Sequence, residues 1–194
     1  MPYHSQFGED RWLAENTFNG SLVESRPFHF CEVGAFDGVQ SSNTLHFEED
    51  LGWWGLCLEP QPRLARQCRE NRDCMVFDFA VSLKKGPVNF FIHPSDQGQS
   101  GMLAEGMMIQ VHSDRLDHIL ESLCFVSLDL LSIDVEGTEL EVWESIGAFR
   151  PRVVIMEYLS GDKVDRSSAI MKRMTLDGYG MIHRTEANLI FEFQ

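Results

Sequence analysis

Short apolar runs alternate with amphipathic stretches along most of the chain. The runs are bounded by glycine, proline or clustered charges, as strands and helices are when they alternate around a parallel sheet. The pattern predicts strands over residues 28–35, 53–59, 74–82, 127–135 and 151–159. It predicts helices over residues 42–51, 62–71, 114–123, 139–146 and 164–177. An α/β fold with a mostly parallel sheet is therefore expected.

Two regions interrupt this alternation. Strand-like runs at 87–93 and 109–112 flank the polar, glycine-containing stretch 94–108. We interpret residues 86–112 as an inserted hairpin with a loop that serves as a substrate lid or is disordered. The closing strands 179–184 and 189–193 are so close in sequence that they predict a hairpin, and hence one antiparallel strand. At 194 residues, the chain 1–194 is expected to form a single domain.

The charge balance narrows the range of partners. Sixteen basic and thirty acidic residues give a net charge of −14. Such a chain repels nucleic acid and anionic membranes at long range, so neither is an expected partner. The first residues lack the pattern of a secretory leader, and no apolar run approaches the roughly 18 residues that a membrane span needs. A cytoplasmic protein is expected.

The motif EVGAFDG, residues 32–38, stands where a buried strand ends and a helix is about to begin. Gly34 allows a ligand to approach the backbone, and Gly38 can adopt a turn conformation closed to other residues. Glu59 ends the next strand about 20 residues further on, where an acid can accept hydrogen bonds from ribose hydroxyls. Together these features predict a nucleoside site, although the two glycines alone would only shape a loop.

The charges around this turn indicate which nucleoside. A dinucleotide site has a second glycine where Phe36 stands, and Glu32 and Asp37 would repel a pyrophosphate. Carboxylates instead suit a cofactor with a sulfonium and an α-ammonium group, which is S-adenosylmethionine. Asp78 ends the third predicted strand, where it either meets the adenine or is solvated.

The motif SIDVEG, residues 132–137, closes the most hydrophobic strand. Asp134 and Glu136 are the first choices for catalytic residues, because an open α/β sheet binds ligands at the carboxyl ends of central strands. The alternative role for both is helix capping. Other candidates for a base were found at further strand ends and loops: Glu157, His93, His112 and His183. Asp134, Glu136 and Glu157 have the oxygens that divalent cations prefer, but no spacing signature supports a metal, and none is assigned.

Residues before the first predicted strand have two interpretations. Gln6, Glu9 and Asp10 fold over the cofactor, or they belong to an amphipathic helix whose acids are solvated. These two interpretations have equal support.

Six segments in order along the chain resemble the FkbM methyltransferase family: SQFGEDRWL, EVGAFDGVQSSNT, GLCLEPQP, AVS, SIDVEGTELEV and PRVVIMEY. The resemblance implies a three-layer, Rossmann-like class I methyltransferase fold, with a seven-stranded sheet that contains one antiparallel strand. It also implies methyl transfer from S-adenosylmethionine, commonly to a hydroxyl of a sugar or natural product. The cofactor-binding residues expected on these grounds are Gln6, Glu32, Gly34, Asp37, Gly38, Asn43, Glu59, Asp78, Ala80 and Asp134.

Two other functions stay open at this point. A nicotinamide-dependent oxidoreductase is supported by Glu59 and opposed by Phe36. A non-catalytic scaffold would keep the shape of the cofactor pocket and bind the cofactor weakly or not at all. The acceptor, expected to be a small molecule or a glycan, and the oligomeric state are not specified by these residues.

Overall fold

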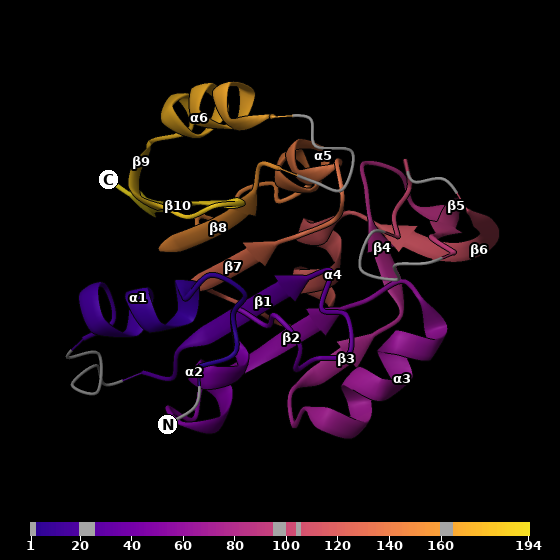
Figure 1. Cartoon of the computed structure of the whole chain (residues 1–194), viewed down its shortest axis with the longest axis horizontal. Coiled ribbons are helices and arrows are strands. Elements are labelled where there is room, and N and C mark those ends of the chain that lie inside the picture. The colour runs from indigo at the N-terminus through magenta and orange to yellow at the C-terminus, as the bar shows by residue number, and fades with distance from the viewer. Residues whose placement is uncertain (1–2, 20–25, 95–99, 104–105, 160–164) are drawn as a thin grey trace.

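The computed structural model describes residues 3–19, 26–94, 100–103, 106–159 and 165–194. Within this part of the chain, seven strands form one sheet in the order β3-β2-β1-β7-β8-β10-β9 (Figure 1). Their bounds are β1 (His29–Val33), β2 (Trp54–Leu58), β3 (Met75–Phe77), β7 (Leu130–Ile133), β8 (Val153–Glu157), β9 (Tyr179–Arg184) and β10 (Asn188–Phe193). Only β10 runs against its neighbours in this sheet. The predicted mostly parallel sheet with one antiparallel strand is confirmed.

Helices cover both faces of this sheet. One face packs against α1 (Glu9–Asn16), α2 (Leu45–Glu49) and α3 (Pro62–Asn71), and the other against α4 (Leu116–Ser122), α5 (Glu139–Glu144) and α6 (Ser167–Leu176). Side chains along β1 alternate between the two cores: Phe30 joins the first, and Cys31 and Val33 join the second. The predicted three-layer architecture is confirmed. In the described part of the chain, no helix has the length and apolar character that crossing a membrane requires.

A second, smaller sheet lies beyond the carboxyl ends of β1, β2 and β3 (Figure 1, right). It consists of β4 (Phe79–Val81), β5 (Gly86–Ile92) and β6 (Met107–Asp114), in the order β4-β6-β5. Strands β5 and β6 are antiparallel, which confirms the predicted hairpin. Of the loop that was predicted to form a lid, residues 95–99 and 104–105 lie outside the described residues.

Several element boundaries differ from the predictions. The single strand predicted over 74–82 is wrong, because the chain changes sheets at Asp78: β3 pairs with β2, whereas β4 pairs with β6. The apolar run continues through Asp78, so the sequence pattern gives no sign of this change of sheet. Helix α2 begins at Leu45 rather than Ser42, because residues 42–44 are bound to the carboxylate of Glu32. Helix α6 begins at Ser167, and part of its predicted first turn falls on residues that are not described.

Candidate functional site

The chain order along the large sheet reverses at β1. Strand β2 lies on one side of β1 and β7 on the other, so the connections leave in opposite directions and a crevice forms at the carboxyl ends. A cavity of about 520 Å³ opens there, lined by residues at the ends of β1, β2, β7 and β8 and by the small sheet. This volume is within the usual range of about 300 to 1,000 Å³ for small-molecule sites.

Most of the predicted site residues meet at this cavity. Those that line it are Gln6, Glu32, Gly34, Asn43, Glu59, Ala80, Asp134 and Glu136. Asp37, Gly38 and Asp78 are not among its described lining residues. Several other lining residues are not predicted as site residues from the sequence, including Phe79, Phe90, Met102, Thr138 and Ala187. Thr138 lies in the motif SIDVEGTELEV, whereas the others carry no chemical motif and only the tertiary structure brings them to the cavity.

Gly34 is the point at which the ends of β1 and β7 come closest. Its φ is 85°, and a Cβ atom there would overlap the backbone carbonyl oxygen of Asp134. The amide N–H of Asp134 in turn donates to the carbonyl of Val33 at 3.0 Å. Only glycine satisfies both the positive φ and the close approach. The glycine thus serves the packing of β1 against β7, and its predicted role toward a ligand stays a prediction.

Glu59, which follows β2, is 6% exposed and lines the cavity. One carboxylate oxygen accepts the N–H of Phe36 at 3.0 Å, and the other accepts the N–H of Gln61 at 2.8 Å. Burial raises the pKa of Glu59 to about 7, although these two N–H groups act in the opposite direction. Each oxygen has a second lone pair, so the carboxylate can also accept hydrogen bonds from a ligand.

Glu32 is also buried, but its carboxylate is used by the chain itself. It accepts hydrogen bonds from the Ser42 hydroxyl at 2.8 Å, the Asn43 N–H at 2.8 Å and the Thr44 hydroxyl at 2.6 Å. The guanidinium of Arg72 lies 3.3 Å from the carboxylate of Glu32 and also pairs with Glu48 of α2. Glu32 therefore fixes residues 42–44 against β1 and so shapes one wall of the cavity.

The three predicted residues outside the cavity have local roles. The carboxylate of Asp37 accepts the N–H groups of residues 39 and 40 at 2.9 and 2.8 Å and so stabilises the turn after β1. Gly38 has a φ of 84°, and a Cβ atom there would lie 2.8 Å from the sulfur of Cys68. Asp78 forms an exposed ion pair with Arg69 at 2.9 Å.

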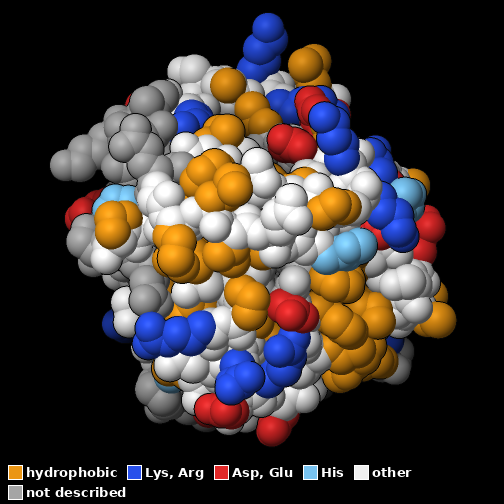
Figure 2. Space-filling view, turned by 90° about the vertical axis from the view of Figure 1, so that its right-hand side faces the viewer, with side chains coloured by type: hydrophobic (Ala, Val, Ile, Leu, Met, Phe, Trp, Pro, Cys, Tyr) orange, Lys and Arg blue, Asp and Glu red, His pale blue; other side chains and the backbone are white. Residues whose placement is uncertain are grey.

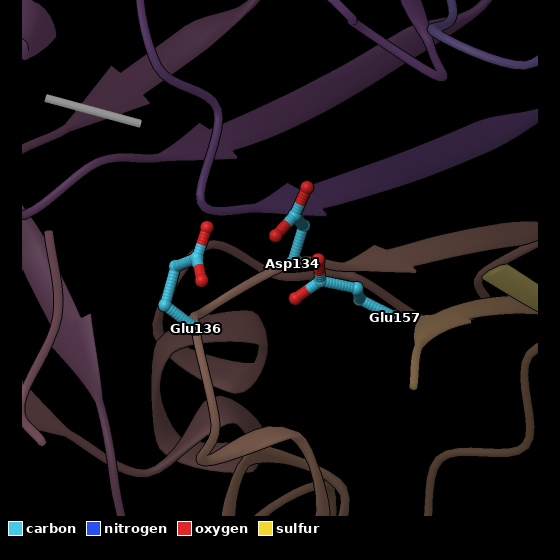
Figure 3. A group of neighbouring side chains, drawn as sticks. All are labelled: Asp134, Glu136 and Glu157. Atoms are coloured by element: carbon cyan, nitrogen blue, oxygen red, sulfur yellow. The ribbon is translucent and has the colours of Figure 1, made fainter. Parts of the chain in front are cut away.

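Asp134, Glu136 and Glu157 bring three carboxylates together. One oxygen from each lies within 4.8 Å of the others, and Figure 3 shows the three groups converging beyond the ends of β7 and β8. Asp134 faces the open cavity, whereas Glu157 is 9% exposed. Desolvation and the neighbouring carboxylates raise the pKa of Glu157, and the same two causes raise that of Asp134. This arrangement suits proton transfer or cation binding.

The candidate histidines are placed elsewhere. His93, His112 and His183 are not among the described residues that line the cavity. The ring of His183 stacks on Trp12 with ring centroids 4.4 Å apart, and the ring centroids of His112 and Phe79 are 4.9 Å apart. Among the described lining residues, the side chains able to accept a proton at neutral pH are therefore carboxylates.

The segment before α1 lies against the cavity through Gln6 and Phe7. Glu9 and Asp10 are fully buried, so the interpretation of a helix with solvated acids is wrong for these two residues. Glu9 accepts hydrogen bonds from Thr185 and from the first residue of β10, both at 2.8 Å. The two acids therefore anchor this segment over the site rather than face a ligand.

The hairpin of the small sheet contributes to both the cavity and the surface. Phe90, Ser100 and Met102 line the cavity. Figure 2, which views the molecule from the side of the small sheet, shows hydrophobic side chains gathered between charged ones. Met107 and Met108 at the start of β6 are 64% and 55% exposed. The hairpin thus joins an apolar surface to the cavity wall.

The strand order, the three layers and the cavity at the reversal point define a class I methyltransferase fold. Solved structures support this assignment. The fibrillarin/Nop5p complex matches with a TM-score of 0.53 and 11% identity over 96% of this chain and 82% of that one. Methyltransferase FkbM from Methylobacillus flagellatus KT matches with a TM-score of 0.54 and 15% identity over 92% of this chain and 46% of that one.

Residues 32–179 match the methyltransferase FkbM domain, and the chain belongs to this family. A relative, the 2-O-methyltransferase NoeI of Sinorhizobium fredii (strain NBRC 101917 / NGR234), is 27% identical over 146 residues. This match covers 63% of the chain and 58% of the relative. The matched region therefore spans little more than half of the relative's length.

Proposed function

We propose that the chain is an S-adenosylmethionine-dependent methyltransferase that methylates an oxygen of a small-molecule or glycan-like acceptor. Family membership and the 2-O-methyltransferase relative support this assignment. The observation that carries it is the composition of the cavity at the reversal point, where Glu59 lies at the end of β2 and three carboxylates converge at the ends of β7 and β8. These groups fit the two parts of the reaction, cofactor binding and acceptor activation.

The cavity residues fit the cofactor in chemistry. Glu59 can accept hydrogen bonds from ribose hydroxyls, and Gly34 lines the cavity at the end of β1. The buried Oδ1 of Asn43 has no hydrogen-bond partner among the described residues, so it can accept a donor such as the α-ammonium group. Ala80 contributes a small apolar contact. When bound, the cofactor supplies an electrophilic methyl group on a positively charged sulfur.

The chain's own residues would orient the acceptor and take up its proton. In-line transfer depends mainly on alignment, and a base is needed where a hydroxyl must lose its proton. We assign that role first to Asp134 and Glu136, because both line the cavity. Gln6 and Phe7 would exclude water from the cofactor side. Glu32, Asp37 and Gly38 would hold the shape of the turn after β1.

Transfer of a labelled methyl group from S-adenosylmethionine tests this proposal. Sugars with a free 2-hydroxyl are compared with the matching 2-deoxy and 2-amino sugars, and the product linkage is determined by mass spectrometry. The expected result is label on oxygen of the hydroxyl acceptors alone. Label found on nitrogen or carbon would contradict oxygen transfer. The Glu121→Gln variant, which changes an exposed acid of α4, is the control for general charge effects.

A further inference from the structure

We propose that Asp134, Glu136 and Glu157 form a site for one hard divalent cation, of the Mg²⁺ or Mn²⁺ class. The role of this cation, which is to hold the acceptor oxygen, rests on the proposed function, whereas its binding does not. The three residues come from the ends of two adjacent parallel strands, β7 and β8. Figure 3 shows their carboxylates directed into one common space.

The spacing of the carboxylates is compatible with a shared cation. Oxygen ligands lie about 2.1 Å from Mg²⁺ and up to about 2.6 Å from Ca²⁺, so two ligands on opposite sides of one ion are about 4.2 to 5.2 Å apart. One oxygen from each of Asp134, Glu136 and Glu157 lies within 4.8 Å of the other two. An ion can therefore contact all three with only small side-chain adjustments. Carboxylates alone favour Mg²⁺, Mn²⁺ or Ca²⁺ over the softer metals that bind to sulfur and imidazole.

Unsatisfied polar atoms around the cluster point to a missing ligand. Glu157 is 9% exposed, faces the other two carboxylates, and its Oε2 has no hydrogen-bond partner among the described residues. Thr138 lines the same cavity and has a buried side-chain oxygen without such a partner in the described part of the chain. Buried polar atoms in proteins nearly always have partners. A cation with its bound waters would supply them.

Glu139 shows that burial of an acid in this turn does not by itself leave it unsatisfied. It is 1% exposed, but its carboxylate accepts the N–H of Gly137 at 2.7 Å. The charge of Arg166 also favours its ionised form, although burial has the larger effect and raises its pKa. The chain thus provides local partners for Glu139. The Oε2 of Glu157, by contrast, has no hydrogen-bond partner among the described residues.

A cation at this position would assist the proposed transfer in a defined way. A bound acceptor hydroxyl is more acidic, so its proton can pass to a carboxylate of the cluster or to water. The acceptor oxygen then forms the new bond to the methyl carbon. The bond between that carbon and the sulfonium breaks, and the sulfur leaves with the electron pair as a neutral thioether. No redox partner is required.

Titration of the metal-free chain with Mn²⁺, monitored by the electron paramagnetic resonance signal of free Mn²⁺, tests the site without cofactor or acceptor. The wild type is expected to bind one ion per chain saturably, with Mg²⁺ as a competitor. Asp134→Asn and Glu157→Gln should each weaken binding at least tenfold. The Glu121→Gln control should bind like the wild type. Circular dichroism and thermal unfolding establish that each variant is folded. Mn²⁺ should raise the Tm of the wild type and of Glu121→Gln, but not that of the Asp134 and Glu157 variants.

The absence of saturable Mn²⁺ binding by the wild type, or equal binding by folded Asp134 and Glu157 variants, would overturn the proposed site. Asp134 and Glu157 would then share a proton instead. Parallel titrations with S-adenosylhomocysteine separate this failure from that of the proposed function. Cofactor binding without Mn²⁺ binding would overturn the cation site alone. Mn²⁺ binding without cofactor binding would support the cation site and contradict the proposed methyltransferase.

Discussion

The carboxylate of Glu32 on β1 and the three carboxylates at the ends of β7 and β8 have different surroundings. Glu32 on β1 is surrounded by donors: two hydroxyls, an amide N–H and the guanidinium of Arg72. Asp134, Glu136 and Glu157, at the ends of β7 and β8, face one another instead. The carboxylate of Glu32 thus serves folding, whereas the Oε2 of Glu157 has no hydrogen-bond partner among the described residues. The partners of a carboxylate, rather than its burial, distinguish the two roles.

The largest effect on stability is expected when the ion pairs of Arg72 are removed. Arg72→Met would leave Glu32 and Glu48 as buried acids without their cation, and breaking such a pair costs about 3 to 5 kcal/mol of unfolding free energy. Urea unfolding measures this loss. Arg69→Met is the matched control, because Arg69 pairs with Asp78 at the surface and should cost less than about 1 kcal/mol. Equal losses of unfolding free energy for the two variants would contradict the proposal that Glu32 and Arg72 stabilise the fold.

The second prediction concerns the converging group. Asp134→Asn should lower turnover by about 10²- to 10⁴-fold, the range for loss of a general base, and leave cofactor affinity nearly unchanged. Steady-state rates and calorimetric titration with S-adenosylhomocysteine separate the two quantities. If both fall together, Asp134 belongs to the cofactor contacts. Glu121→Gln should change neither.

The third prediction tests Glu59 as the ribose contact. Glu59→Ala should weaken binding of S-adenosylmethionine by roughly 1.5 to 3 kcal/mol, the range for hydrogen bonds to a charged group. Calorimetric titration of wild type and variant measures the difference. Unchanged affinity would exclude the ribose role. Glu49→Ala, an exposed acid of α2, serves as the control.

A pH dependence follows from the same residue. Burial raises the pKa of free Glu59 to about 7, and ribose hydroxyls would bind to the ionised form. The ionised fraction rises about tenfold between pH 6 and pH 8, so cofactor affinity should rise by about tenfold, or about 1.4 kcal/mol. For the unliganded fold the sign is opposite. Protonated Glu59 stabilises it below about pH 4.5, and this contribution is lost as the pH rises through 7.

Titrations with S-adenosylhomocysteine at several pH values measure this trend. The Glu59→Gln variant should lose most of the pH dependence. A wild-type affinity that is constant between pH 6 and pH 8 would contradict the assignment.

The smallest expected effect is that of Glu157→Gln on stability, which is compared with that of Glu32→Gln. Glu157→Gln removes one of three mutually repelling acids, so unfolding free energy in the absence of metal should be unchanged or should rise by up to about 1 kcal/mol. Glu32→Gln should instead lower it, because Arg72 would lose a partner. Urea unfolding in the presence of a chelator measures both. A clear loss of stability for Glu157→Gln would show that this acid serves the fold.

Periodicity and motif order predicted the layers, the sheet and the hairpin, because each depends on local apolar patterns and turn residues. They did not predict the change of sheet at Asp78, because the apolar run continues through it. The Gly-rich turn and Glu59 were predicted to lie at the site from their spacing. The partners of Glu32 were not, because Arg72 is distant in sequence and its contact depends on how α3 packs. Likewise, only the pairing of β7 with β8 brings Glu157 to Asp134.

Calorimetric titration of the purified chain with S-adenosylmethionine, S-adenosylhomocysteine and NAD in parallel tests the central claim most directly. The proposed site at the ends of β1, β2 and β7 should bind the first two ligands and not NAD. Binding of NAD alone would indicate an oxidoreductase. Binding of none of the three would contradict the proposed methyltransferase and favour a scaffold that keeps only the shape of the fold.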